Sequence, residues 1–272
     1  MDRVVTLFGG GGFLGRYVAQ ALYGKGVRVR IAQRDPRQAY FLKPLGGLGQ
    51  TQFVRADIND PASVAAAVAG SEAVINLVGI LKGPFTRIHV DGARNIAEAA
   101  SAAGVPALVH VSAIGADPAS PSAYGSSKGK GEEAVRAAFP GATILRPSTV
   151  FGREDNFINR FAGMARMMPV LPVIRGDAKF QPVYVADVGH AAADALLDPE
   201  AHGGKTYELG GPQVLTMRAL NRWICEVTGR NRLIVDVPDP VAAAMARFAG
   251  WAPGAPITWD QWLMLQRDAV VS

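Results

Sequence analysis

Five glycines fall within seven positions near the start of the chain, in the stretch LFGGGGFLG (residues 7–15). Each costs backbone entropy that alanine would not, so the stretch needs a physical reason. Gly9 would permit a tight turn, Gly12 would let a pyrophosphate approach the backbone, and Gly15 would let helix and strand pack closely. Phe13 and Leu14 would open that helix, whose free N–H groups and dipole favour an anion. The stretch predicts a dinucleotide site, and a plain glycine-rich connection is the alternative.

A tyrosine and a lysine form a second candidate site in YGSSK (residues 124–128). On a helix, Tyr124 and Lys128 would face the same side because they stand four residues apart. Ser112 precedes them at the end of an apolar run. Its hydroxyl could touch a ligand or simply bond the adjoining turn.

The elements that position these residues alternate along the first half of the chain. We expect strands at 4–8, 27–32, 52–56, 73–78, 107–111 and 143–146, and helices at 13–23, 61–70, 91–103 and 126–138. Asp35 and Asp60 each precede a proline and predict helix N-caps. The alternation predicts an α/β fold with a doubly wound parallel sheet of the Rossmann type over residues 1–150. Beyond residue 150 the alternation breaks down, and 151–272 is expected to form a smaller lobe over the carboxyl edge of the sheet.

Composition narrows the function classes. The 272 residues are 49% hydrophobic and 19% charged, which is typical of a soluble globular protein. The net charge of +5 comes without a dense Lys/Arg block, so nucleic acid is not an expected partner. One cysteine, Cys225, and four scattered histidines predict neither a disulfide nor a metal site. No secretory signal or membrane-length apolar run is seen, which favours a cytoplasmic location or a peripheral one on the inner face of the membrane.

Several motifs in order carry a family resemblance. The glycine spacing is GxxGxxG, Asp57-Ile58 follows the third expected strand, NLVG (76–79) follows the fourth, and YxxxK, ILRPSTVFG and FQPVYVADV come later. Together they resemble the extended short-chain dehydrogenases over nearly the whole chain. The segments 110–140 and 145–166, above all FGRED (151–155), resemble an atypical branch that contains the nucleotide-binding accessory subunit of respiratory complex I and its bacterial relatives.

The resemblance implies a nicotinamide dinucleotide and the residues that hold it. It implies binding by Gly9, Gly12, Phe13, Leu14, Gly15, Arg34, Asp57, Ile58, Leu77, Val78, Gly79 and Lys128. Asp57 and Ile58 would hold the adenine, the residues from Leu77 to Gly79 would close over the cofactor, and Lys128 would bond the nicotinamide ribose.

The end of the second expected strand selects between the two cofactors. An acid there bonds the ribose 2′-hydroxyl of NAD, whereas an arginine accommodates the 2′-phosphate of NADP. Arg34 lies nearest the strand end, and Asp35 has a sufficient role as an N-cap. NADP(H) is therefore preferred, with extra positive charge expected from Arg16 and Arg37. NAD(H) bound through Asp35 is the alternative, in which Arg34 is an ordinary surface residue.

The resemblance also implies a catalytic set, with one departure. Tyr124 would donate the proton, Lys128 would lower the pKa of that tyrosine, and Ser112 would position the substrate oxygen. The enzymes usually carry two adjacent hydroxyl residues, of which the second is catalytic, and Ala113 replaces the second here. We therefore expect a mainly structural cofactor in a complex I or other membrane-associated assembly. The alternative is an oxidoreductase or epimerase acting on a small carbonyl, sugar-like or quinone-related substrate.

The segment 240–251 (PVAAAMARFAGW) is amphipathic, and Trp259 and Trp262 follow it. It could contact a partner, lipid or quinone, or simply cap the smaller lobe as a core helix.

Overall fold

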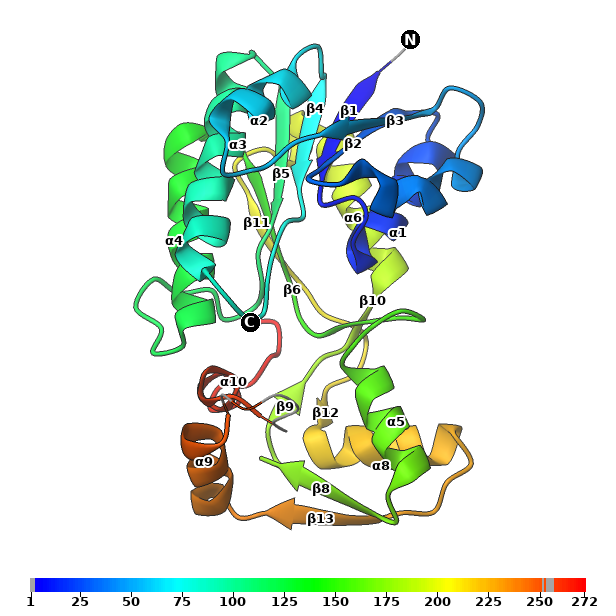
Figure 1. The fold of residues 1–272 in the computed structure, drawn as a ribbon, viewed down its shortest axis with the longest axis vertical. Coiled ribbons are helices and arrows are strands. Elements are labelled where there is room, and N and C mark those ends of the chain that lie inside the picture. The colour runs from blue at the N-terminus through cyan, green and yellow to red at the C-terminus, as the bar shows by residue number, and fades with distance from the viewer. Residues whose placement is uncertain (1–2, 251, 253–256) are drawn as a thin grey trace.

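A computed structural model describes residues 3–250, 252 and 257–272, and it divides into a large upper part and a smaller lower lobe (Figure 1). The large part contains β1 (Val4–Phe8), α1 (Phe13–Gly24), β2 (Arg28–Gln33), η1 (Pro36–Leu45), β3 (Thr51–Arg55), α2 (Pro61–Val68), β4 (Ala73–Asn76), η2 (Thr86–Asp91), α3 (Gly92–Ala102), β5 (Ala107–Val111), α4 (Ala123–Ala138) and β6 (Thr143–Pro147). The remaining elements are β7 (Val150–Phe151), α5 (Ile158–Met167), β8 (Val170–Ile174), β9 (Lys179–Phe180), β10 (Val183–Tyr184), α6 (Val185–Leu197), α7 (Pro199–His202), β11 (Thr206–Leu209), β12 (Leu215–Thr216), α8 (Met217–Val227), β13 (Leu233–Val237), α9 (Asp239–Phe248) and α10 (Trp259–Met264).

A seven-stranded sheet in the order β11-β6-β5-β4-β1-β2-β3 forms the centre, and every neighbouring pair is parallel. Helices α1 and α6 cover one face, and α2, α3 and α4 cover the other (Figure 1). Both faces are covered, which explains why β4 and β5 consist of buried residues throughout. The predicted doubly wound α/β fold is confirmed.

Local capping signals place several helix starts. Asp35 accepts a hydrogen bond from the backbone N–H of Arg37, and Asp60 accepts one from Ala62, so both predicted N-caps are confirmed. The predicted start of the helix at residue 126 is wrong, because α4 begins at Ala123. Ser122 caps it there by accepting from the N–H of Gly125.

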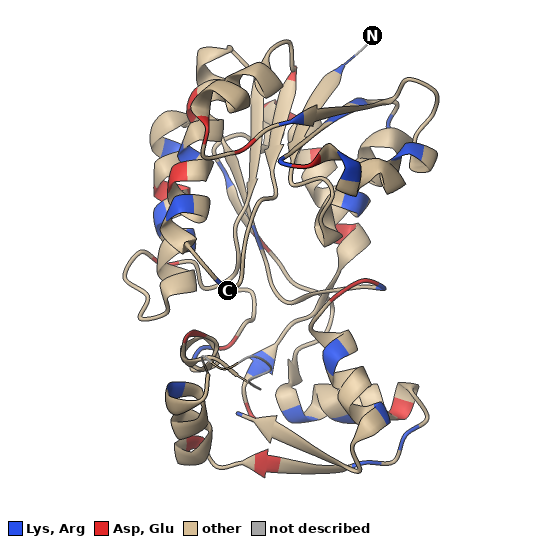
Figure 2. Cartoon of the chain, viewed as in Figure 1, with Lys and Arg blue, Asp and Glu red and all other residues tan. Residues whose placement is uncertain are grey.

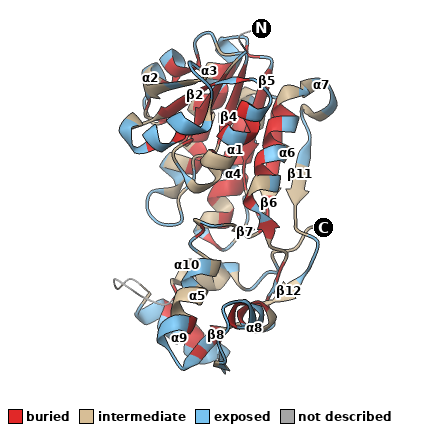
Figure 3. Cartoon of the chain, turned by 90° about the vertical axis from the view of Figure 1, so that its right-hand side faces the viewer, coloured by how far each residue is buried: buried red, intermediate tan, exposed pale blue. Residues whose placement is uncertain are grey.

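The second half of the chain contributes to both parts. Helix α6 packs on α1, and β11 pairs with β6 at the edge of the main sheet. The lower lobe is built from α5, α8, α9, α10 and short paired strands, with β13 parallel to β8 and β12 antiparallel to β9. Buried residues gather in the large part, while the lobe has small clusters around residues such as Phe180 and Leu171 (Figure 3). The boundary near residue 150 stays a prediction, with α6 and β11 lying on the sheet after it.

The amphipathic segment 240–251 corresponds to α9 and the residues after it. Its small residues Ala242 and Ala246 are buried, whereas Val241 and Met245 are exposed. Trp251 lies outside the described residues.

Candidate functional site

The glycine stretch forms a tight turn between β1 and α1. Gly9 has a φ of 82°, which favours glycine, and its carbonyl accepts the N–H of Gly12 at 3.0 Å. A Cβ on Gly15 would lie 2.5 Å from the carbonyl oxygen of Gly10, so the turn and the helix pack too closely for a side chain. Gly12 is different, because its φ of −81° and ψ of 178° suit any residue. The fold therefore needs Gly9 and Gly15 but does not itself need Gly12.

The start of α1 suits an anion. Its N-cap, Gly12, offers no side-chain hydrogen bond, and its first turn, which includes Phe13 and Leu14, contains no acidic residue. The first N–H groups of a helix need partners, and the helix dipole favours negative charge there. A pyrophosphate group fits this turn for these reasons.

Three polar residues follow one another at the end of β2, and they differ in their hydrogen-bond partners. Gln33 turns back onto the glycine turn, where its Oε1 accepts the N–H of Gly11 at 3.0 Å. The carboxylate of Asp35 is bound by Arg37, with the two side chains 2.9 Å apart. Arg34 is exposed and makes no hydrogen bond or ion pair with the described residues. Sequence reasoning gave Gln33 no role, although its place at the end of β2 is the signal that could have identified it.

The extra positive charge expected from Arg16 and Arg37 is already paired. Arg37 is bound to Asp35. Arg16 forms an ion pair with Glu154, and its guanidinium lies 4.5 Å from the centre of the Phe41 ring. These two arginines lie near the turn, but their charges are compensated by local carboxylates.

Glu154 belongs to the FGRED segment, which fastens the chain after β7 to α1. Besides Arg16, it accepts a hydrogen bond from the hydroxyl of Tyr17 at 2.7 Å. The buried Asp155 organises the same segment by accepting backbone N–H groups of Phe157 and Ile158 at 2.8 and 2.6 Å. The segment that carries the most specific family resemblance is thus a clamp on the first helix of the predicted nucleotide site.

The Asp57-Ile58 pair lies in the turn after β3 and is held from two sides. Hydrogen bonds from Asn59, first from its backbone, lower the pKa of the Asp57 carboxyl. The positive charges of Arg34 and Arg87 add to this lowering of the pKa. Asn95 of α3 donates to the carbonyl of Ile58 at 2.8 Å. Asn95 therefore fixes the turn that is predicted to hold the adenine.

The loop after β4 lies directly on the glycine turn. A Cβ on Gly9 would lie 3.3 Å from the backbone of both Leu77 and Val78. Asn76 accepts the N–H of Val78 through its side chain at 3.0 Å, which holds the loop in place. Leu77 and Val78 thus lie next to Gly9, and the exposed Gly79 follows them in the same loop. That these residues close over a cofactor stays a prediction.

Lys128 and Ser112 meet at the carboxyl end of β5. The buried Lys128 ammonium donates to the carbonyl of Val111 at 2.8 Å, directly before Ser112. Burial lowers the pKa of Lys128 to about 8, against the opposing charge of Glu132. The hydroxyl of Ser112 is buried and has no hydrogen-bond partner among the described residues, so it does not bond the adjoining turn. A buried hydroxyl without a partner is unusual, which singles out Ser112 as a candidate group of the site.

Tyr124 lies one helical turn before Lys128 on α4, as the spacing predicts. Its ring packs edge-on against His89 and Phe85, and within the described ranges its hydroxyl makes no hydrogen bond. Burial raises the pKa of Tyr124 to about 12. This direction is opposite to the lowering by Lys128 that the resemblance implies, and it keeps the phenol protonated.

His89 connects the loop after β4 to the start of α4. Its Nε2 accepts the N–H of Ile80 at 3.0 Å, so in the neutral ring Nδ1 carries the proton and donates to Ser127 Oγ at 2.8 Å. Ser127 in turn donates to the carbonyl of Tyr124 at 2.8 Å. Burial lowers the pKa of His89 to about 4, with a contribution from the charge of Lys128, and this keeps the ring neutral. The chain of bonds positions Tyr124 relative to the predicted cofactor loop.

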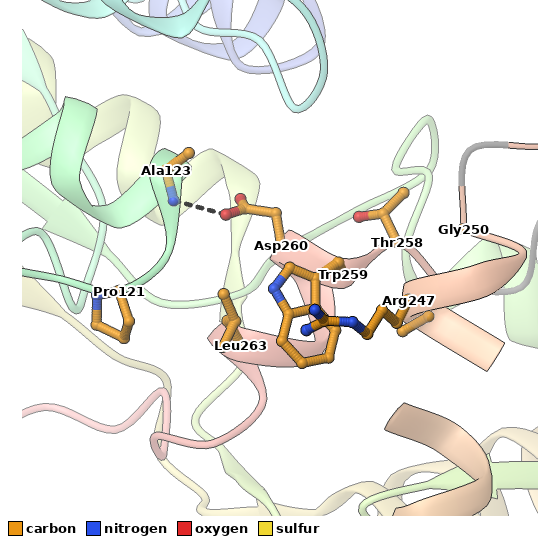
Figure 4. Close-up of a pocket in the computed structure, with 9 residues that line it drawn as sticks. Pro121, Ala123, Arg247, Gly250, Thr258, Trp259, Asp260 and Leu263 are labelled. Atoms are coloured by element: carbon orange, nitrogen blue, oxygen red, sulfur yellow. Dashed lines mark hydrogen bonds between the residues drawn. The ribbon is translucent and has the colours of Figure 1, made fainter. Parts of the chain in front are cut away.

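A hollow of about 470 Å³ lies beside the start of α4, between the two parts (Figure 4). Asp260 of α10 lines it and accepts the N–H of Ala123 at 2.6 Å, so the lower lobe helps to cap α4. Trp259 and Arg247 form its far wall. Its lining includes Ala123 and Asp260 but not Tyr124 or Lys128.

Neither a metal site nor a membrane-spanning helix is present among the described residues. The described ranges hold no group of three or more His, Cys, Asp or Glu side chains that could bind a metal ion. None of the helices that the structure describes has the length and apolar character needed to cross a membrane.

Comparison with known proteins gives consistent matches. A family model described as "NAD dependent epimerase/dehydratase family" matches residues 5–210. The mitochondrial "NADH dehydrogenase [ubiquinone] 1 alpha subcomplex subunit 9" of Arabidopsis thaliana is 39% identical over 250 residues, which cover 89% of this chain and 62% of that protein. The chain thus spans about three-fifths of that relative. A "Ceramide reductase" of Caulobacter vibrioides is 32% identical over 92% of this chain and 78% of its own.

A solved structure supports the fold. Triphenylmethane reductase of Citrobacter sp., in complex with NADP(H), has a TM-score of 0.78 and 22% sequence identity. The match covers 99% of this chain and 92% of that one.

Proposed function

Because the chain belongs to the NAD dependent epimerase/dehydratase family, we propose that it holds NADP(H) as a mainly structural cofactor. Its place would be in a membrane-associated assembly such as respiratory complex I, on the cytoplasmic side. The complex I subunit from Arabidopsis thaliana, at 39% identity, supports this role. The observation that carries the proposal is the combination of a turn at the start of α1 that carries no acidic residue with an alanine at position 113, where the enzymes carry a hydroxyl.

The preference for NADP(H) rests on the end of β2. An Asp or Glu reads the ribose of NAD by accepting a hydrogen bond from its 2′-hydroxyl, and Asp35 already accepts bonds from the Arg37 side chain and from the backbone of its own helix. Arg34 is exposed, and its charge reaches the Asp57 region. A 2′-phosphate on Arg34 would gain a charge-assisted bond of roughly 1.5–3 kcal/mol.

Calorimetry with NADPH and NADH tests this preference. We expect NADPH to bind at least about tenfold more tightly, and Arg34→Ala should remove most of the difference. Lys130→Ala serves as the control, since Lys130 is an exposed basic residue on α4 outside the site. A wild-type preference for NADH would assign the ribose to Asp35 and refute the assignment to Arg34.

The structural role of the cofactor has its own test. A tightly held nucleotide should remain with the purified protein, and its addition should raise the melting temperature by mass action. Tyr124→Phe should change neither result, because only the unbonded hydroxyl is lost. Protein that purifies without nucleotide and gains no thermal stability from NADPH would contradict the proposal.

A reductase is the second candidate, favoured by the buried, unpartnered hydroxyl of Ser112 beside Lys128. A bound nicotinamide would supply hydride chemistry here. Ser112 would orient the substrate oxygen, and Tyr124 would donate its phenolic proton to that oxygen. NADPH oxidation should be assayed over a panel of carbonyls and quinones with wild type and Tyr124→Phe. Turnover that falls roughly 10²–10⁴-fold in Tyr124→Phe would replace the structural proposal with this one.

A further inference from the structure

Two adjacent loops form the end of the lower lobe that lies farthest from the main sheet (Figure 1). One joins α5 to β8, and the other joins α8 to β13. The N–H of Leu233 donates to the carbonyl of Pro169 at 3.2 Å, and Arg232 Nε donates to the carbonyl of Ala165 at 2.7 Å. These bonds hold the two loops side by side. We define the end patch as Arg166, Met167, Met168, Val170, Arg230, Leu233 and Val235.

The centre of the end patch is apolar and exposed. Met167 retains 86% of its accessible surface, Leu233 retains 64% and Val235 retains 44%. Leu233 pairs with Val170 in the register of β13 and β8, so their side chains share the outer face of this two-stranded sheet. Solvent-facing sheet surfaces normally carry polar residues, and a continuous exposed apolar face marks an interaction surface.

The charge around the end patch is net positive. Residues 164–174 and 226–236 contain three arginines and two acids, Glu226 and Asp236, and Asp236 is paired with Arg218. Arg166 and Arg230 are exposed beside the apolar residues, and Figure 2 shows basic segments in the loop between α8 and β13. An apolar centre with a cationic rim complements an anionic lipid surface. A second copy docked end to end would instead bring like charges together.

We propose that the end patch docks the protein on an anionic phospholipid bilayer. Met167, Met168 and Leu233 enter the headgroup region, while Arg166 and Arg230 contact lipid phosphates. The inference deepens the membrane-associated role proposed above and rests on it. It requires no part of the nucleotide site, because none of the end-patch residues lies among those predicted to bind the cofactor.

Vesicle cosedimentation tests the proposal with the full chain. The probes are vesicles of pure phosphatidylcholine and vesicles of equal parts phosphatidylcholine and phosphatidylglycerol. We expect binding to the mixed vesicles that weakens with salt. Arg166→Gln and Arg230→Gln should each reduce it roughly fivefold, and Met167→Gln roughly tenfold. The matched controls are Lys130→Gln and Leu48→Gln, which alter exposed basic and apolar residues outside the end patch.

Each other outcome overturns the proposal. The proposal is refuted if the protein fails to bind the mixed vesicles or binds pure phosphatidylcholine equally well. It is also refuted if the control variants lose as much binding as the end-patch variants. Concentration-dependent dimers that disappear in Met167→Gln, without vesicle binding, would assign the end patch to a second copy. NADPH affinity measured on the same variants should stay unchanged. Wild-type protein that binds NADPH but not the mixed vesicles refutes the end patch alone, while wild-type protein that binds the mixed vesicles but not NADPH refutes the cofactor proposal alone.

Discussion

Replacing Gly12 with valine separates the requirements of the fold from those of the ligand. The backbone at Gly12 is extended, and a Cβ there would meet just one atom within 4 Å, the carbonyl oxygen of Gly9 at 3.2 Å. That contact is tight, so the turn must shift by a few tenths of an ångström. The valine also restricts the unfolded chain, which favours folding by about 0.4–1 kcal/mol. We therefore expect Gly12→Val to change the free energy of unfolding by less than about 1 kcal/mol.

The same substitution should abolish most nucleotide binding. The side chain would occupy the space above the start of α1, where a pyrophosphate must approach the N–H groups of Phe13 and Leu14. Two charge-assisted hydrogen bonds lost there amount to about 3–6 kcal/mol. The dissociation constant for NADPH should rise by about 10²–10⁴-fold.

Calorimetry and urea unfolding measured on the same preparations provide the assay. Gly24→Ala is the benign control, since Gly24 ends α1 with no atom within 4 Å of its added Cβ. Gly15→Ala is the opposite control, because its Cβ would collide with the backbone of Gly10 and should cost about 1–3 kcal/mol of stability. A folded Gly12→Val protein with wild-type affinity for NADPH would refute the assignment of this turn to the pyrophosphate.

Two further predictions concern stability. Glu132 is buried and bound by two hydrogen bonds from Arg146, at 2.9 and 2.7 Å, so Glu132→Gln should lose about 1–3 kcal/mol in urea unfolding. The exposed neighbour variant Glu133→Gln should change by less than about 0.5 kcal/mol, and equal effects would contradict the role of the buried pair. The folded pKa of His89, about 4, lies below its unfolded value of 6.5, so the unfolded chain binds the proton first. The contribution of neutral His89 to the free energy of unfolding is fully present above pH 6.5. This contribution should fall by up to about 3 kcal/mol as the pH drops towards 4. His89→Gln should flatten this slope in urea titrations at a series of pH values, and an unchanged slope would exclude His89 as its source.

Much of the sheet and the glycine turn could be predicted because their signals are local. Glycine spacing, apolar runs and Asp-Pro starts each act within a few residues, and the parallel sheet follows from their alternation. The start of α4 could not be predicted so well, since Asp260 contributes to its cap from 137 positions away. The pairing of Arg16 with Glu154 spans 138 positions, so no local pattern could have shown that its charge is compensated. In contrast, the role of Asp35 as an N-cap could be predicted from the sequence, because its partner Arg37 is only two residues away.

The surroundings of the side chains at the site could not be predicted from the sequence either. Tyr124 and Lys128 are spaced to share a face of α4, and they do. The groups that surround Tyr124 and Lys128 come from elements that are distant in the sequence. The packing of these elements determines the pKa of both side chains. His89 is an example, since its two ring nitrogens bridge Ile80 and Ser127 from different elements.

The path of the chain between its two parts has a consequence for how the molecule unfolds and evolves. The chain leaves the sheet after β6, returns with α6 and β11, and leaves again with β12. It comes back near its end, where the N–H of Ser272 bonds Glu208 of β11 at 2.9 Å. Neither part is therefore one continuous stretch of sequence. A fragment cut at residue 150 would lack the edge strand β11 and the helix that covers α1, so limited proteolysis should release no stable piece of that length. Exchanging the lobe between relatives would therefore require the replacement of separate segments of the chain together.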